Sequence, residues 1–238
     1  MILYKYCPWN KYTITALALK GLWCHHATKM NDPFECFWTV DRKFSDDVLD
    51  QFREFSSSAK SQTLRKLATL DNQRLTESIN KDRREKVKKY AFCSLSENPF
   101  DILMWSHYAD SHQGIALGFE FEDFGNEKIF QKVRYAERLD EYDLMSWAWF
   151  MEGDDSLMVG FLRDLTIKSL DWEREKEWRI WRKEPCYYNY KSHEIKEILF
   201  GINCTAETKS IISRIVDLQD DVNLVEIETR NDPFGLVR

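Results

Sequence analysis

The chain has 238 residues, of which 31% are charged and 43% apolar, proportions that describe a globular protein with a buried core rather than a disordered chain. The 34 Lys and Arg residues against 40 Asp and Glu residues give a net charge of −6, which excludes a uniformly basic nucleic-acid-binding surface but not a local basic patch. No apolar run approaches the ~18 residues of a membrane span, and the first residues lack the apolar core of a signal peptide, so we expect a cytoplasmic protein with no membrane partner.

The first half of the chain is expected to begin with strands and continue with helices. Residues 2–6 and 22–23 are typical of strands, and they flank a helix over 14–20 that we expect to end at Gly21 as its C-cap. Helices are expected over 45–90, because Ser45 and the acidic residues after it are typical of a helix start.

The second half alternates strands and helices irregularly. The expected elements are a strand over 91–95, a helix over 100–109, strands over 115–121 and 128–136, helices within 140–170 with Asp154 or Asp155 as an N-cap, strands over 186–190 and 195–200, a helix over 205–216 and a strand over 222–227. No linker rich in Pro, Gly or Ser divides the chain. We therefore predict an α+β fold in a single domain, 1–238, with a helical insertion or lobe over 41–90.

Six cysteines occur without a C-x-x-C pair or zinc-finger spacing, so we expect buried thiols rather than disulfides or a metal site. Aromatic residues are 14% of the chain, including nine Trp, and they predict a core or a pocket that stacks a planar ligand. Residues 81–89 are rich in Lys and Arg. They form either a solvated helix face or a patch that contacts the phosphates of a nucleic acid.

Glutamates recur at alternate positions in residues 172–182, WEREKEWRIWR. In a strand, Glu173, Glu175, Glu177 and Arg179 would share one face, where the carboxylates would repel one another unless a cation intervened. In a helix, Glu175 would instead pair with Arg179 on a solvated surface. Both structures stay open, and the Trp-Arg-Ile-Trp run favours the strand.

Two further segments carry polar groups that could bind a ligand. On a helix, residues 104–114 would place Trp105, Tyr108 and His112 near one face with His107 beside it, either as a core-facing stripe or as an aromatic wall for a stacked base. The two histidines lack the H-x-x-x-H spacing of zinc enzymes. The Asn-Asp-Pro-Phe sequence at 31–34, which occurs again at 231–234, predicts turns, although its polar side chains could also bind a ligand.

Taken in order, a series of short segments resembles a widespread bacterial family described only as a domain of unknown function. The segments are Leu3-Tyr-Lys-Tyr, Asn31-Asp-Pro-Phe-Glu, Phe92-Cys-Ser-Leu-Ser-Glu, Met104-Trp-Ser-His-Tyr-Ala with Gly114, Glu175-Lys-Glu-Trp-Arg and Glu197-Ile-Leu-Phe-Gly. The resemblance spans nearly the whole chain. Its family context implies a role in bacterial conflict or phage defence, with a partner protein from the same operon.

The order of a first strand, a serine-bearing strand and an E-x-E strand is also similar to the ADP-ribosyltransferase fold. This resemblance implies small mixed or antiparallel sheets that form a cleft for NAD, with Glu177 as catalytic carboxylate and Glu175 as its companion. Lys5 departs from related folds, which carry His or Arg at its position. The resemblance and the motifs together give the candidate NAD-contacting residues as Tyr4, Lys5, Tyr6, Asn31, Asp32, Ser94, Ser96, Trp105, His107, Tyr108 and Arg179.

Three functions stay open. The first is an NAD-consuming transferase or toxin-like effector, in which Glu177 stabilises positive charge on the ribose and an unknown protein or nucleic acid accepts the ADP-ribose. The second is a non-catalytic sensor or interaction domain, in which the same residues form a buried polar network. The third is a magnesium-dependent nuclease, in which Asp32, Glu35, Glu175 and Glu177 hold the metal and residues 81–89 hold nucleic acid.

Overall fold

The computed structural model describes residues 1–238 except 35, 37–39, 41–42, 138–141, 154–157 and 217–221. The chain divides into two compact units, of which the first comprises Met1–His25, Ala91–Val133 and Asp171–Arg238 and the second His26–Tyr90 and Arg134–Leu170. The helices expected in the 41–90 segment belong to the second unit. That residues 1–238 form one domain stays a prediction.

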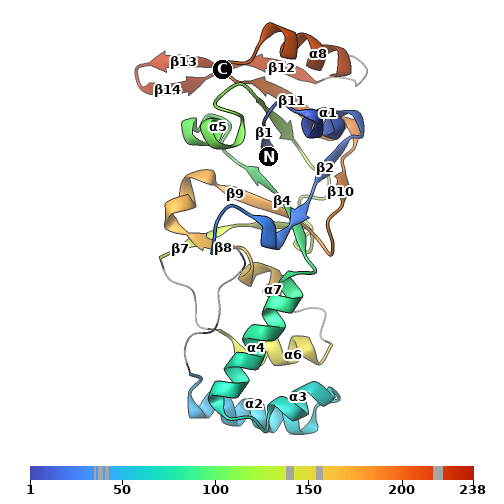
Figure 1. Ribbon diagram of the computed structural model, residues 1–238, viewed down its shortest axis with the longest axis vertical. Coiled ribbons are helices and arrows are strands. Elements are labelled where there is room, and N and C mark those ends of the chain that lie inside the picture. Colours follow the sequence, from blue (N-terminus) through green and yellow to red (C-terminus); the bar gives the residue numbers. More distant parts are fainter. Residues whose placement is uncertain (35, 37–39, 41–42, 138–141, 154–157, 217–221) are drawn as a thin grey trace. The chain divides into compact units, whose positions relative to one another are not determined.

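The first unit is built on a sheet of eight strands, whose main path has the order β12–β11–β5–β1–β4–β9–β6 (Figure 1). Its strands are β1 (Leu3–Cys7), β3 (His25–His26), β4 (Ala91–Ser96), β5 (Ile115–Phe119), β6 (Phe130–Lys132), β9 (Glu177–Arg182), β11 (Ile195–Phe200) and β12 (Asn223–Glu226). Neighbours along this path run antiparallel, except for the parallel pair β11 and β12. The α+β fold class with mixed and antiparallel sheets is therefore confirmed.

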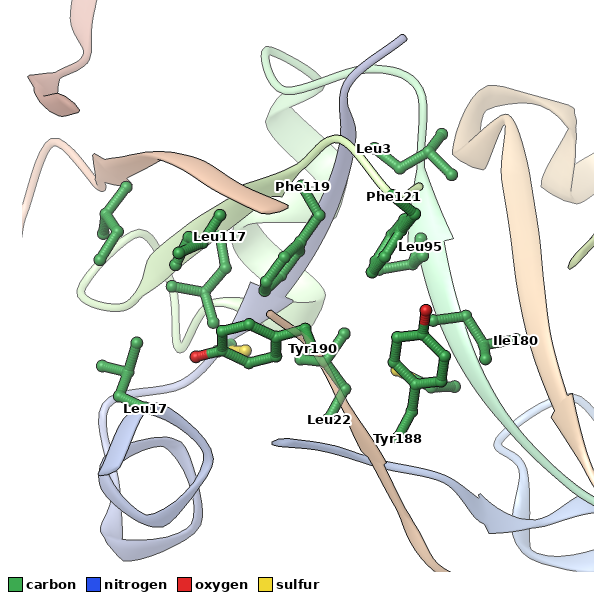
Figure 2. Close-up of a cluster of buried hydrophobic side chains, with 14 of the residues drawn as sticks. Leu3, Leu17, Leu22, Leu95, Leu117, Phe119, Phe121, Ile180, Tyr188 and Tyr190 are labelled. Carbon is green, nitrogen blue, oxygen red and sulfur yellow. The ribbon is translucent and has the colours of Figure 1, made fainter. Parts of the chain in front are cut away.

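Apolar clusters cover both faces of this sheet, because successive side chains of a strand point to opposite faces. Figure 2 shows the larger cluster, to which the sheet contributes Leu3, Leu95, Leu117, Phe119 and Ile180, and other elements contribute Leu17, Leu22, Phe121, Tyr188 and Tyr190. The cluster on the opposite face, called the aromatic face below, consists of Tyr4, Tyr6, Trp105, Ala109, Ala116, Leu199, Ile227 and Leu236.

Shorter elements complete the first unit. They are α1 (Lys11–Ala18), β2 (Gly21–Trp23) paired with β10 (Tyr187–Asn189), α5 (Ile102–Tyr108), the 3-10 helices η3 (Leu170–Glu175) and η4 (Ser192–Glu194), α8 (Ala206–Val216), and the hairpin of β13 (Glu228–Asn231) and β14 (Phe234–Val237). Asn10 begins α1, since its side chain accepts hydrogen bonds from the amides of Tyr12 and Thr13. Asp101 begins α5 in the same way.

The second unit is mainly helical. It contains η1 (Ala27–Lys29), α2 (Asp46–Ser58), α3 (Gln62–Leu67), α4 (Asn72–Val87), α6 (Leu144–Met151), α7 (Met158–Asp164) and the parallel pair β7 (Arg134–Ala136) and β8 (Ile167–Ser169). Its core includes Leu49, Phe52, Leu64, Leu75, Ile79, Leu144 and Trp147. No helix in the described parts of the chain is long and apolar enough to cross a membrane.

The basic segment 81–89 lies at the end of α4. Some of its basic side chains are buried in the second unit or form ion pairs within it. Arg83 is buried, with its guanidinium carbon 5.0 Å from the centre of the Tyr142 ring. Lys86 and Lys88 form ion pairs of 2.9 and 2.7 Å with acidic residues of the same segment. The exposed basic side chains besides Lys88 are Lys81, Arg84 and Lys89. Nucleic-acid contact through 81–89 stays a prediction.

Two expectations for the secondary structure are wrong, and a third lies outside the described residues. The strand expected over 128–136 is divided, because the Val133 amide bonds to the Glu177 carbonyl of the first unit and the Arg134 amide to the Thr166 carbonyl of the second. Gly21 is not a left-handed C-cap: Lys20 takes the positive φ of 51°, and Gly21 starts β2. The N-cap expected at Asp154 or Asp155 lies outside the described residues. All six cysteines lie in described parts of the chain: Cys7, Cys24, Cys36 and Cys93 are buried as expected, whereas Cys186 and Cys204 are partly exposed.

We expect Gly201→Ala to destabilise the first unit. A Cβ atom at Gly201 would lie 2.1 Å from the carbonyl oxygen of His112, which is held by a 3.0 Å bond from the Asn203 amide. Overpacking against fixed backbone costs about 1–3 kcal/mol, measurable by urea unfolding. Gly125→Ala is the control, since a Cβ there has no atom within 4 Å. Equal unfolding midpoints for the two variants would contradict this account.

Candidate functional site

Residues chosen from the sequence come together on three neighbouring strands of the first unit, β1, β4 and β9. Tyr4 of β1 pairs with Ser96 of β4, and Ser96 pairs with Glu177 of β9, so these residues form one row across the sheet. Paired residues share a face of a sheet, which places the row on the aromatic face. The next row holds Ser94 and Arg179.

Glu177 forms a buried ion pair with Arg179. Glu177 is 3% exposed and Arg179 0%. The guanidinium contacts both carboxylate oxygens, with Nε 2.9 Å from Oε1 and Nη2 3.2 Å from Oε2. Its carbon lies 4.4 Å from the centre of the Phe92 ring. Because each ion compensates the burial of the other, the carboxylate is held ionised and in one orientation.

Glu175 connects the E-x-E segment to α5. Its Oε1 accepts a 2.7 Å hydrogen bond from the hydroxyl of Tyr108, the last residue of α5. The Ser96 hydroxyl donates to the Glu175 carbonyl at 2.6 Å. At the start of α5, the Asp101 carboxylate accepts from Arg174 Nε at 3.3 Å. Both ends of α5 are therefore bonded to the segment that leads into β9.

The E-x-E glutamates do not share a strand. Residues 177–182 form a strand as favoured, but the residues before them form η3, and Glu173 is exposed there. Lys176 separates the two elements with a positive φ of 42°, a left-handed conformation that turns the chain. The prediction of glutamates 173, 175 and 177 on one strand face is thus wrong, and so is the helical alternative, since Arg179 lies in strand β9 and not on a helix shared with Glu175.

Lys5 adds a second cation near this pair. Its Nζ donates to the Ser94 carbonyl at 3.0 Å. Burial by itself would lower the pKa of Lys5, whereas Cys93, Cys7 and Glu177 raise it, and the net shift is upward. Since burial raises the pKa of both thiols, that of Cys7 to about 12, they are neutral at neutral pH and Glu177 supplies the negative charge.

The aromatic candidates are core residues in this structure. Trp105 is fully buried, donates its indole N–H to the Pro99 carbonyl at 2.8 Å, and meets the Tyr6 ring edge-on at 5.2 Å between centroids. The Tyr4 hydroxyl donates to Glu197 at 2.7 Å, and burial followed by this bond raises the pKa of Tyr4 to about 12. His107, in contrast, is exposed on α5.

Asn31 and Asp32 belong to the second unit. Asp32 is buried, and its carboxylate accepts a 2.8 Å hydrogen bond from the Phe34 amide, which confirms the expected turn. Glu35, which the magnesium hypothesis needs, lies outside the described residues. Within the described parts of the chain, no group of three or more His, Cys, Asp or Glu could hold a metal ion.

His112 has unusual surroundings that sequence reasoning did not assign. Asp110, Ser111 and His112 are consecutive left-handed residues, with φ of 49°, 52° and 67°. The Ser106 hydroxyl donates to the Ile102 carbonyl at 2.9 Å, so it accepts from His112 Nε2 at 3.1 Å. Nδ1 of His112 is then an unprotonated acceptor, buried and without a hydrogen-bond partner among the described residues.

His112 should make stability fall in mild acid. Burial lowers the pKa of His112 below its ordinary 6.5, so the unfolded chain binds a proton that the folded chain does not. Its stabilising contribution is complete above the unfolded pKa and is lost as pH falls through the folded pKa. His112→Asn removes this titration and tolerates a positive φ. Urea midpoints at about pH 7 and about pH 5 should drop less for this variant than for the wild type, and equal drops would refute the assignment.

The Glu177–Arg179 pair should show strong energetic coupling. Glu177→Gln and Arg179→Met each remove one member of a buried ion pair, at a cost of about 3–5 kcal/mol. The double variant should therefore be more stable than the sum of single effects predicts, by at least about 1 kcal/mol. Urea unfolding of all four proteins measures this, with the exposed pair Glu85 and Lys88, which should show no measurable coupling, as control. Additive effects of Glu177 and Arg179 would contradict the prediction.

Comparison with known proteins finds a match to a family whose function is unknown. The family described as "Protein of unknown function (DUF2971)" matches residues 104–180. This match confirms the expected resemblance to an uncharacterised family, and it includes Trp105, Tyr108, Glu175 and Glu177 but not β1 or β4. No curated protein and no solved structure matches the chain.

Proposed function

We propose that the first unit cleaves the bond between nicotinamide and ribose in NAD and transfers ADP-ribose to an acceptor. The observation that carries the proposal is the row of Tyr4, Ser96 and Glu177 on adjacent strands. They lie on the first strand, on the serine-bearing strand and on the strand that begins at the second glutamate of the E-x-E motif, in the order that the resemblance to ADP-ribosyltransferases implies. Residues far apart in the sequence are thus cross-strand neighbours, which supports the proposal.

The proposed reaction breaks the glycosidic C–N bond heterolytically. The electron pair stays with nicotinamide, which leaves neutral, and the ribose carbon gains positive charge. Water or an acceptor hydroxyl, amine or similar nucleophile then bonds to that carbon and loses its proton to solvent. A carboxylate that is held in place before the reaction stabilises the developing charge more in the transition state than in the ground state.

Several contacts fit Glu177 for this role. Arg179 keeps its carboxylate ionised and oriented through the contacts of 2.9 and 3.2 Å. Lys5 points to the opposite face of β1, because Tyr4 and Tyr6 on either side of it face the aromatic cluster, and its charge acts on Glu177 through the sheet. Tyr108 and Glu175, joined at 2.7 Å by the hydroxyl proton that Tyr108 donates, form the polar end of α5, where a ribose hydroxyl would find phenolic and carboxylate oxygens as acceptors.

Glu177→Gln should abolish most of the activity. We expect nicotinamide release from NAD to fall at least about 100-fold, as on loss of one electrostatic stabiliser. Glu173→Gln is the matched control, because Glu173 belongs to the same segment but is exposed, and it should leave turnover unchanged. Release is followed chromatographically, with circular dichroism to confirm folding.

Glu177→Asp keeps the test decisive if the Gln variant unfolds, since it retains the charge opposite Arg179 but shortens the side chain by one methylene. We expect it to fold and to lose most turnover. A folded Glu177→Gln variant with full nicotinamide release, or a folded wild type that releases none with water or with protein and nucleic acid as acceptors, would overturn the proposal.

A second candidate is a non-catalytic sensor or interaction domain. The observation in its favour is that the carboxylates of Glu175 and Glu177 are both bonded within the unit, to Tyr108 and Arg179. On this account Glu177→Gln lowers the melting temperature while the wild type shows no NAD turnover. The cytoplasmic location expected from the sequence applies to either function, and the family context adds the expectation of a partner protein from the same operon.

A further inference from the structure

We propose that the β13–β14 hairpin is an autoinhibitory cover over the aromatic face of the first unit, held closed by Arg238. The inference rests on the proposed function, because it concerns access to that same site. It is carried by burial, by the separation of the hairpin from the eight-stranded sheet and by the identity of the residue to which Arg238 binds.

The aromatic face is closed in this structure. Tyr4, Tyr6 and Trp105, which the resemblance assigns to NAD contact, are all buried. The same cluster contains Ile227, at the base of the hairpin, and Leu236 of β14, both buried. A nicotinamide or adenine ring can stack on these aromatic side chains only after an element that covers them has moved.

The hairpin is the more weakly held of the two elements on this face. It forms a two-stranded sheet of its own rather than joining the eight-stranded sheet. All four residues of β13 are exposed, and Phe234 of β14 is 84% exposed. In contrast, α5 is bonded at both ends to the E-x-E segment, through Asp101 and Tyr108. Both elements contact the same cluster, as their neighbouring positions in Figure 1 illustrate.

An ion pair joins the residue after the hairpin to the sheet, and the Ile227 amide at the base of the hairpin donates to the Phe200 carbonyl of β11 at 3.3 Å. Arg238 Nη2 lies 2.7 Å from Oε1 of Glu197, a buried residue of β11. The same oxygen accepts the hydrogen bond from the hydroxyl of Tyr4. Glu197 therefore links the Arg238 cation to Tyr4, which belongs to the row that contains Glu177. Opening the hairpin would leave Glu197 buried without this cation, a cost that favours the closed state.

Charge removal at Arg238 tests the proposal in the full chain. Arg238→Gln should speed hydrogen exchange of the hairpin amides and of residues 3–6, while β9 stays protected, and should raise nicotinamide release about tenfold by shifting the open population. Glu228→Gln is the matched control, because it neutralises one charge on exposed β13 and should change neither measurement. Arg238→Lys, which keeps the cation, should remain close to the wild type.

The outcomes separate this inference from the proposed function. Unchanged exchange in Arg238→Gln, or faster exchange with unchanged or lower release, would overturn the autoinhibitory cover. A third outcome is faster exchange in Arg238→Gln while neither the wild type nor any variant releases nicotinamide. This outcome would show that the hairpin opens, but it would refute the proposed NAD cleavage and, with it, the proposed autoinhibition. Leu236→Ala, which weakens the apolar anchor and leaves the ion pair, should reproduce the Arg238→Gln result, and failure to do so would contradict the proposal.

Discussion

A buried ion pair between neighbouring side chains on β9 is the constraint on which the first unit depends. Neither Glu177 nor Arg179 could be buried alone, so the pair specifies which face of β9 points toward the aromatic cluster. Once that face is specified, β4 is held in register beside it, with Ser94 opposite Arg179 and Ser96 opposite Glu177. The hydroxyl of Ser96 then holds the backbone before Lys176, which allows Glu175 to reach α5.

The elements that sequence reasoning placed correctly are those with local signals. The buried run at 195–200 became β11, and the amphipathic stretch at 205–216 became α8 with nearly the expected bounds. The sequence did not predict features whose conformation depends on contacts with residues far away in the chain. Lys176 is left-handed because the chain must turn between contacts to α5 and to β4, and the β13–β14 hairpin follows a segment that predicts only a strand and a turn.

The candidate site shows the same division. That Tyr4, Ser96 and Glu177 belong together could be predicted, because motif order indicates which strands carry them. The hydrogen bonds of these residues could not be predicted, since Tyr4 donates to Glu197, which is 193 residues away in the sequence. Burial of the aromatic candidates was left open by the pattern, because helical spacing is the same for a core-facing stripe and a ligand-facing wall. Only the partners of Trp105 distinguish the two.

The division of the chain into interleaved segments sets an order for biosynthesis. All of the second unit has been translated once residue 170 leaves the ribosome, and by then β1 can already pair with β4 and β5. Strands β4 and β5 still lack their outer partners β9 and β11 at that stage, so each keeps one unpaired edge while the helices of the second unit assemble around their own core. Such a chain exposes two strand edges during synthesis, which makes vectorial folding, and chaperone binding to the nascent three-stranded sheet, a direct result of its topology.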